Sequence, residues 1–192
     1  MTPPGRTLDT PASGGPSPSD PDIMARLAAG ESNALGALYD RYQARLRRFV
    51  ARATADAEDV DDVVQATFLT AAKAAGRYDG RASCHPWLLG IAARLLRRRR
   101  RALGRFLGVL SSVTGAWATA VDPRPALQAR NDVERALRRL SEAKRLAILM
   151  AEVEGLSCPE IAAALHIPLG TVWTRLHAAR YELRRALQGE TP

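Results

Sequence analysis

Apolar residues recur at intervals of three and four along most of the chain, which is the spacing of one face of an amphipathic helix. One such stretch comprises Leu35, Leu38, Tyr39, Tyr42, Leu46, Phe49 and Val50. A second comprises Val60, Val63, Val64, Thr67, Phe68 and Ala71. A third follows Pro86, which suits a first helical turn, and comprises Trp87, Leu88, Ile91 and Leu95. Because no stretch alternates as a strand does, the pattern predicts an all-α fold, with a helical bundle at residues 22–101.

A second set of helices is predicted after a stretch that contains Gly and Pro. The apolar period resumes at residue 131 and ends near Gly155, a residue type that commonly terminates helices. Ser157 and Glu160 match a capping box, and Thr171 is expected to cap the last helix. His166 lies in the turn, where it tolerates a left-handed conformation. We therefore expect two small helical domains, at 22–101 and 131–188, with a disordered tail at 1–21 and a flexible linker at 102–130.

The stretch from residue 155 to residue 180 has the organisation of a helix-turn-helix. Its second helix would present polar residues that can enter a major groove. Helix pairs with short turns are also common as plain packing units, so geometry alone leaves DNA binding and a structural role open. The net charge of +3 between Thr171 and Gln188 favours DNA. A metal-binding role for His166 is less favoured, because no Cys or His lies at ligand spacing.

Charge points to a polyanionic partner. Lys and Arg number 28 against 20 for Asp and Glu, and 26 of the 28 cations are Arg, which suits bidentate phosphate and guanine contacts. Seven arginines follow one another on the third predicted helix, at Arg94, Arg97, Arg98, Arg99, Arg100, Arg101 and Arg105. A solvated face is the alternative. Mutual repulsion without any acidic residue between 80 and 121 favours a nucleic-acid backbone.

Flat side chains precede this basic stretch. Tyr78, His85 and Trp87 lie beside the arginines in the sequence, a combination suited to single-stranded bases that stack. Trp87 also lies on the apolar stripe of its helix. For Trp87 alone we therefore expect a core position with one edge exposed.

Five acidic residues crowd into positions 56–62, just before this basic region. They could simply offset the macrodipole at the start of their helix. That explanation suits Asp56 to Asp59. The macrodipole explains less well why Asp61, Asp62 and Gln65 share a face opposite the apolar residues. This face could dock a basic protein surface.

Several function classes are disfavoured. Cys84 and Cys158 form no CxxC pair, so we expect free thiols without metal, no cofactor, and a reducing cytoplasm. The first 21 residues lack the basic start and apolar core of a signal peptide, and the uncharged run at 106–121 is too short to span a bilayer. A nuclease would need metal-binding carboxylates within the basic surface, where there are none.

These segments together resemble the extracytoplasmic-function sigma factors of bacterial RNA polymerase, which consist of region 2 and region 4 domains. The resemblance covers residues 22–187. Residues 34–42 (ALGALYDRY) resemble the opening helix of region 2, 59–69 (DVDDVVQATFL) the polymerase-clamp helix, and 77–92 the promoter-melting segment, with its RYDG and WLLGIA motifs. GLSCPEIA and GTVWTRL, which begin at Gly155 and Gly170, are similar to region 4.

The resemblance implies a sigma factor that binds core RNA polymerase, recognises −35 and −10 promoter elements and promotes DNA melting, and that is not an enzyme. It implies polymerase contacts by Asp61, Asp62 and Gln65. It implies contacts to the melted −10 strand by Arg81, Ser83, His85, Trp87, Arg94, Arg97, Arg98 and Arg101. It implies −35 duplex contacts by Thr171, Trp173, Thr174, Arg175, His177, Arg180 and Arg184. An anti-sigma factor is implied as a further partner.

A simple helix-turn-helix transcription regulator is the alternative hypothesis. Such a protein would carry an N-terminal ligand-binding or dimerisation domain and would not bind core polymerase. It would explain residues 131–188 but neither the arginines on the third helix nor the carboxylates on the second.

Overall fold

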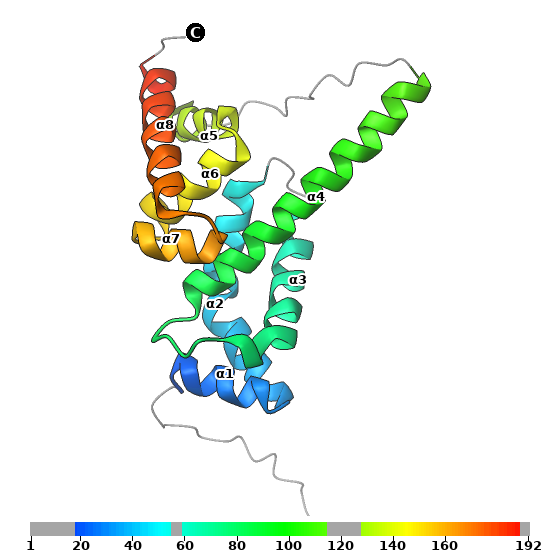
Figure 1. Cartoon of the computed structure of the whole chain (residues 1–192), viewed down its shortest axis with the longest axis vertical. Helices are drawn as coiled ribbons and strands as arrows, with labels where there is room; N and C mark the ends of the chain where they lie inside the picture. The colour runs from blue at the N-terminus through cyan, green and yellow to red at the C-terminus, as the bar shows by residue number, and fades with distance from the viewer. Residues whose placement is uncertain (1–17, 55–58, 115–127, 189–192) are drawn as a thin grey trace, which may run out of the picture.

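The computed structural model describes residues 18–54, 59–114 and 128–188, and all regular structure within these ranges is helical (Figure 1). The predicted all-α fold is thereby confirmed. The first group of helices comprises α1 (Asp20–Ala28), α2 (Ser32–Ala53), α3 (Asp59–Ala74), the 3-10 helix η1 (Ala75–Arg77) and α4 (His85–Thr114). The second comprises α5 (Gln128–Arg139), α6 (Glu142–Ile148), the π-helix η2 (Leu149–Val153), α7 (Cys158–Leu165) and α8 (Leu169–Leu187).

The first group forms a bundle around the long helix α2, which packs against α1, α3 and α4. The apolar stripes predicted from the sequence line its core. Fully buried side chains from the four helices include Ile23, Leu38, Phe49, Val63 and Leu88. Helices α3 and α4 also pack against each other, so their solvent-exposed polar faces are neighbours on the surface.

Local sequence rules account for the second group. Ser157 and Glu160 form both hydrogen bonds of the capping box at the start of α7. Gly155 (φ 69°) and His166 (φ 52°) adopt the left-handed conformations expected at helix ends. The assignment of Thr171 as a cap is wrong: α8 begins at Leu169, because Pro168 supplies the extended N-cap backbone and its carbonyl accepts the first helical bonds.

Two helices reach into segments for which the sequence favours irregular structure. α1 begins at Asp20, inside the expected tail, because Ser19 and Asp22 form a complete capping box there. α4 continues to Thr114 and α5 begins at Gln128, so both ends of the expected linker are helical. Residues 1–17 and 115–127 lie outside the described ranges.

The two groups of helices pack directly on each other, and their buried apolar residues form one continuous core. The principal contact lies between α4 and α7, and Figure 1 shows α7 next to the lower part of α4. Gly90 makes this approach possible, because a Cβ at that position would lie 2.4 Å from the carbonyl oxygen of Ala164. Helix α2 also contacts α6 and η2. We call this contact region the seam.

Candidate nucleic-acid interface and protein-docking face

Helix α3 presents the three predicted docking residues on one exposed face. Asp61, Asp62 and Gln65 are exposed, whereas Val63 on the opposite side is buried. The Asp61 carboxylate pairs with a guanidinium of α2, and Asp62 Oδ2 lies 3.0 Å from Arg99 Nη2 of α4. Exposed ion pairs of this kind add little stability. A basic partner can therefore replace those arginines at low cost.

Leu69 extends this face by one helical turn beyond Gln65. Its side chain is 50% exposed. Sequence reasoning missed it as a surface residue, although it lies outside the apolar stripe and its position four residues after Gln65 is the signal that could have found it. An apolar centre next to charged residues is the usual composition of a protein interface. We call Asp61, Asp62, Gln65 and Leu69 the docking face.

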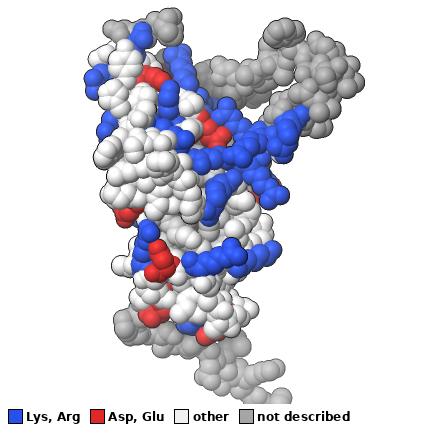
Figure 2. Space-filling model, in the orientation of Figure 1, with Lys and Arg blue, Asp and Glu red and all other residues white. Residues whose placement is uncertain are grey.

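The arginines of α4 form a broad positive surface, seen as a blue band across the middle of Figure 2. Arg94, Arg98, Arg101 and Arg105 are exposed. Arg99 turns to Asp62, and Arg100 Nη1 lies 3.4 Å from Glu142 Oε2 of α6. The exposed members thus remain the ones best placed to meet phosphates. We call Arg94, Arg98 and Arg101 the arginine surface.

Four of the predicted −10 residues come together in one pocket at the start of α4. Arg81, Ser83, Trp87 and Arg94 line it, together with Ala164 and His166 from the second group of helices. The loop between η1 and α4 supplies the first two residues. The indole of Trp87 is half-buried, as expected. Arg77 and Asp79 line the pocket as well, so it offers an aromatic edge, three arginines and one carboxylate to a ligand.

Tyr78 contacts two residues that line this pocket, Trp87 and Arg81. Its ring meets the Trp87 ring edge-on with centroids 5.5 Å apart, and its hydroxyl donates to the Arg81 carbonyl at 2.6 Å. Burial raises the pKa of Tyr78, so the hydroxyl remains a donor at neutral pH. Arg81 is held further by an ion pair with Asp79 at 2.6 Å. The loop is thus ordered by its own side chains.

His85 is placed differently from the other predicted −10 residues. It is 4% exposed, and its ring stacks on Tyr42 with centroids 5.7 Å apart. Its Nε2 lies 2.9 Å from Oε2 of Glu154, which follows η2. The imidazole of His85 therefore contacts protein groups on both sides of the seam, Tyr42 and Glu154.

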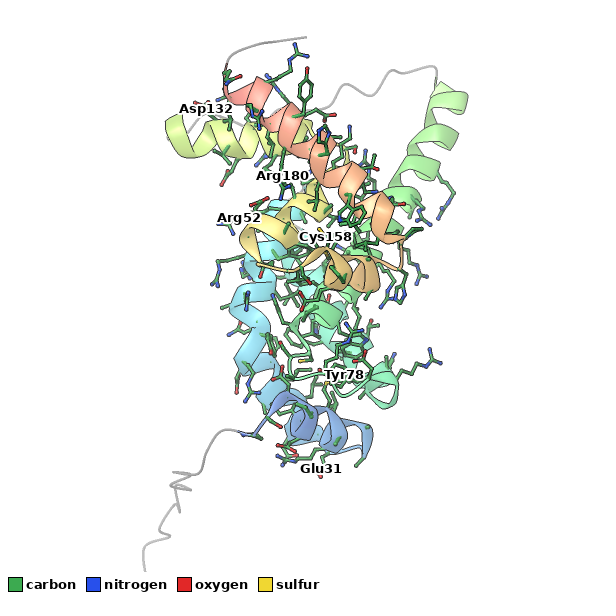
Figure 3. All side chains as sticks on the ribbon, turned by 60° about the vertical axis from the view of Figure 1, so that its left-hand side comes forward. Glu31, Arg52, Tyr78, Asp132, Cys158 and Arg180 are labelled. Atoms are coloured by element: carbon green, nitrogen blue, oxygen red, sulfur yellow. The ribbon has the colours of Figure 1, made fainter. Side chains whose placement is uncertain are left out.

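Most of the predicted −35 residues lie on the outer face of α8. Trp173, Thr174, His177, Arg180 and Arg184 are exposed, whereas Thr171 and Arg175 are half-buried. Figure 3 shows Cys158 and Arg180 on the adjacent helices α7 and α8, which together line a shallow groove beside Trp173.

Two of these polar side chains already have partners within the chain. The Thr174 hydroxyl donates to the Gly170 carbonyl at 3.0 Å, and Arg180 pairs with Glu152 at 2.7 Å.

Candidate metal ligands are scattered in the described residues. No group of three or more His, Cys, Asp or Glu side chains there could hold a metal ion. Both cysteines are free, and burial raises the pKa of Cys84 to about 12, so its thiol is not a nucleophile at neutral pH. None of the described helices is long and apolar enough to cross a membrane.

Comparison with known proteins identifies the family. The sigma-70 region 2 model matches residues 38–106, and the sigma-70 region 4 model matches residues 130–183. The RNA polymerase sigma factor CarQ of Myxococcus xanthus is 34% identical over 170 residues, covering 87% of this chain and 96% of CarQ. The ECF RNA polymerase sigma-E factor of Escherichia coli is 30% identical over 182 residues, covering 88% and 95%. The chain belongs to the ECF sigma factors of RNA polymerase.

Solved structures agree with this sigma-factor fold. CnrH in complex with the cytosolic domain of CnrY superposes with a TM-score of 0.62 at 28% identity, over 90% of this chain and 99% of CnrH. The sigma factor RpoE of Bartonella quintana, in complex with the anti-sigma factor NepR, has a TM-score of 0.67 at 24% identity, over 81% and 98% of the two chains. The second likeness concerns the fold alone.

The regions of the sigma factor coincide with the surfaces described above. The region 2 match contains the docking face, the arginine surface and the pocket residues Arg81, Ser83, Trp87 and Arg94, and the region 4 match contains α7 and most of α8. Tyr181, missed from the sequence, is 55% exposed and lines the α8 groove. It lies four residues after His177, and this helical spacing from a predicted contact is the signal that could have found it.

The seam brings two predicted DNA-binding residues of the sigma factor together. Arg97 of region 2 and Arg175 of region 4 each have a buried guanidinium nitrogen, Nη2 and Nη1 respectively, without a hydrogen-bond partner in the described structure. Burial lowers the pKa of Arg97, and the charge of Arg175 lowers it further. Two like charges therefore face each other where region 2 meets region 4, and they oppose the contact.

Proposed function

We propose that this sigma factor contacts the clamp of core polymerase through its docking face, captures one melted −10 strand at the pocket of Arg81, Ser83, Trp87 and Arg94, and reads the −35 duplex with α8. Binding of polymerase and promoter, and transcription initiation without enzymatic activity, belong to its family. The convergence of four −10 candidates on one pocket beside the arginine surface supports the assignment most strongly. Cations for phosphates next to an aromatic edge suit a single strand.

The simple regulator hypothesis leaves the first half of the chain unexplained. The region 2 match covers residues 38–106, which carry the docking face and the four −10 candidates of the pocket. Run-off transcription with core polymerase on genomic promoter fragments tests the proposal. We expect discrete transcripts only when both core enzyme and this protein are present. Their absence, with promoter fragments still bound by the protein alone, would favour the regulator.

Reversing two charges on the docking face should weaken polymerase binding. We expect Asp61→Arg with Asp62→Arg to lower the affinity for core enzyme at least tenfold, because like charges then meet the basic partner surface. The unfolding free energy should change by no more than about 0.5 kcal/mol per exposed site. Fluorescence anisotropy of labelled protein titrated with core enzyme measures the affinity.

Asp132→Arg is the matched control, because Asp132 is also an exposed, ion-paired carboxylate but lies on α5. It should leave the affinity for core enzyme unchanged. Equal affinities of the unaltered protein, the double variant and Asp132→Arg for core enzyme would contradict a docking role of α3. A loss of stability in the double variant would instead indicate that the two carboxylates cap the helix.

Two substitutions on α8 should separate base reading from phosphate contact. Thr174→Val should change which −35 sequence is preferred, because a base contact discriminates by about 1 to 3 kcal/mol. Arg184→Ala should lower affinity for every sequence alike, because a phosphate carries no sequence information. Selection from a randomised −35 duplex library, followed by sequencing, measures both. A uniform loss in both variants would place the groove-facing side of α8 elsewhere.

An anti-sigma protein is a further proposed partner. The solved structures of CnrH and Bartonella RpoE are complexes, the second with an anti-sigma factor. Because a sigma factor acts together with RNA polymerase, we also propose a cytoplasmic location for this protein.

A further inference from the structure

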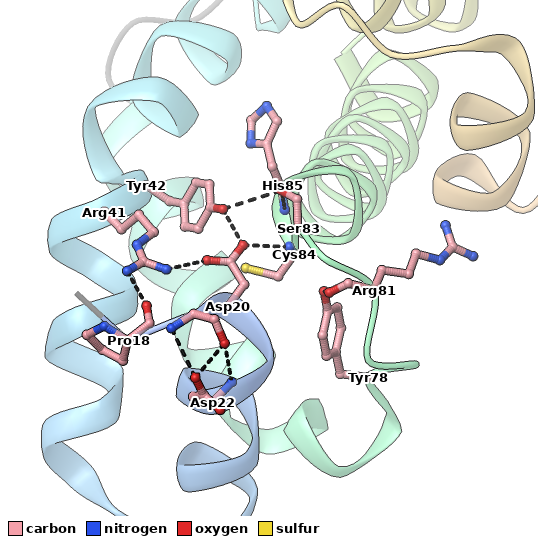
Figure 4. A network of polar contacts seen from close by, with 11 residues as sticks. Pro18, Asp20, Asp22, Arg41, Tyr42, Tyr78, Arg81, Ser83, Cys84 and His85 are labelled. Atoms are coloured by element: carbon pink, nitrogen blue, oxygen red, sulfur yellow. Dashed lines mark hydrogen bonds and ion pairs between the residues drawn. The ribbon is translucent and has the colours of Figure 1, made fainter. Parts of the chain in front are cut away.

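Asp20 is a buried carboxylate at the start of α1, and its side chain accepts hydrogen bonds from distant parts of the chain. It is 5% exposed. Its Oδ2 accepts the Tyr42 hydroxyl and the backbone N–H of Cys84, the latter at 2.8 Å, and its Oδ1 accepts Arg41 Nη1 at 2.5 Å (Figure 4). Cys84 is the last residue before α4 and lies 64 positions away from Asp20. Asp20 therefore joins α1, α2 and the loop that forms the pocket.

The start and the docking of α1 also rest on residues other than Asp20. Ser19 and Asp22 already form the capping box of α1. The apolar residues Ile23 and Met24 of α1 are buried in the core, at 0% and 1% exposure. A buried charge is costly unless it is hydrogen-bonded, and the hydrogen bonds of Asp20 go to the pocket loop and to α2.

The network continues from Asp20 into the pocket. The Tyr42 hydroxyl, which Asp20 holds, lies 3.4 Å from Ser83 Oγ, and Ser83 Oγ accepts the His85 N–H at 3.2 Å. The Cys84 side chain is fully buried beside them. Residues 83–85 are thus fixed from behind by polar contacts, while Ser83 and Arg81 face the pocket. Burial opposes ionisation of Asp20, but the bonds from Tyr42, Cys84 and Arg41 lower its pKa overall, so it is charged at neutral pH.

We propose that Asp20 is a positioning residue for promoter melting: through Cys84 and Tyr42 it holds the 81–85 loop in the shape that receives the melted −10 strand. This inference rests on the proposed role of the pocket. Asp20 itself does not touch the DNA. It acts by holding one backbone N–H and one hydroxyl, and any −10 strand bound at Ser83 and Arg81 depends on that geometry.

Asp20→Asn in the full-length protein, assembled with core polymerase, tests the proposal. Asn keeps the shape but replaces one acceptor oxygen by an NH2 donor, so it cannot accept all three donors. We expect at least a tenfold loss of affinity for the non-template −10 strand of the strongest run-off promoter, and weaker permanganate reactivity of its thymines. Affinities for core enzyme and for the −35 duplex should stay within twofold.

Asp22→Asn is the matched control, because it removes a carboxylate of the same helix whose hydrogen bonds within the described residues go to Ser19. It weakens α1 without touching the loop. Cys84 supplies a second readout: in a Cys158→Ser background, the reaction of Cys84 with a thiol reagent should accelerate at least tenfold in Asp20→Asn and little in Asp22→Asn. Tyr42→Phe, which removes one link and keeps the ring, should show a smaller loss in the same direction and decides the case if Asp20→Asn does not fold.

The outcomes separate this inference from the proposed function. Failure of the unaltered holoenzyme to bind the −10 strand would overturn the role of the pocket, and the role of Asp20 with it. Normal strand binding by both Asp20→Asn and Tyr42→Phe would overturn the role of Asp20 alone. Equal losses in Asp20→Asn and Asp22→Asn would also overturn it, because they would reflect a general loosening of α1.

Discussion

In the structure region 2 packs on region 4 at the seam, and we call this arrangement the closed form. Replacing Glu154 by Gln should shift the protein toward an open form, in which the two regions are apart. Glu154 is 6% exposed and belongs to region 4, but its Oε2 accepts Arg45 Nε at 2.8 Å and His85 Nε2 lies at 2.9 Å, both from region 2. A hydrogen bond to a charged group contributes about 1.5 to 3 kcal/mol. Arg45 is partly solvated, so we expect the substitution to remove about 1.5 kcal/mol, or roughly a tenfold change in the open-to-closed ratio.

Small-angle scattering of the full chain measures this shift as a larger radius of gyration. Glu152→Gln is the matched control, because Glu152 lies two residues earlier but pairs with Arg180 inside region 4. It should leave the scattering unchanged. Identical profiles for the unaltered protein and both variants would show that the Glu154 carboxylate does not hold the seam.

The same carboxylate predicts the direction of a pH effect. Burial alone would raise the pKa of Glu154, but hydrogen bonds from His85 and Arg45 lower it below the ordinary glutamate value. A lowered pKa stabilises the closed form at pH values above the ordinary glutamate pKa, and this contribution is lost as the pH falls through the lowered pKa. Acid should therefore open the unaltered protein more than it opens Glu154→Gln.

Opening has a functional consequence, because the seam covers parts of both proposed DNA-binding surfaces. Arg97 and Arg175 are half-buried against each other, and α7 residues line the −10 pocket. The repulsion between the two arginines works against the closed form, and the Glu154 contacts work for it. Phosphates of promoter DNA would favour the open form by meeting both arginines separately.

Local rules explain which parts of the fold could be predicted from the sequence. The capping box at Ser157 and the left-handed His166 depend on neighbouring residues alone, and both were predicted correctly. The extension of α4 past Gly104 and Gly108 was not predicted, because glycines are typical of linkers. The helix continues through them because each glycine costs only about 1 kcal/mol and good helix formers surround them.

The seam and the Asp20 network lie beyond sequence reasoning for a different reason. His85 and Glu154 are 69 residues apart, and Arg45 and Glu154 are 109 apart. Nothing in the spacing of charges indicates which distant carboxylate a buried His will meet. The same limit applies to the predicted site: the exposure of Trp173 followed from helical spacing, whereas the burial of His85 depends on a contact with the other domain.

Removing two members of the arginine surface should impair promoter melting. Arg98 and Arg101 are exposed on α4, whereas Arg97 is half-buried and has a buried guanidinium nitrogen at the seam. Each phosphate neutralised on single-stranded DNA contributes about 0.7 to the slope of log affinity against log salt concentration. Arg98→Ala with Arg101→Ala should therefore flatten that slope for the −10 strand by up to about 1.4. Open-complex formation should fall most at high salt.

The control has to remove the same charge from another face of the same domain. Arg48→Ala with Arg52→Ala does so on α2, at helical spacing and outside the pocket and the arginine surface. That protein should keep both the salt slope and the permanganate pattern of the unaltered holoenzyme, because net charge alone acts weakly over more than a Debye length of about 10 Å. If the α4 variant melted promoters normally at every salt concentration at which the unaltered protein works, the arginine surface would be a solvated face only. If both double variants failed alike, net charge rather than this surface would explain the binding.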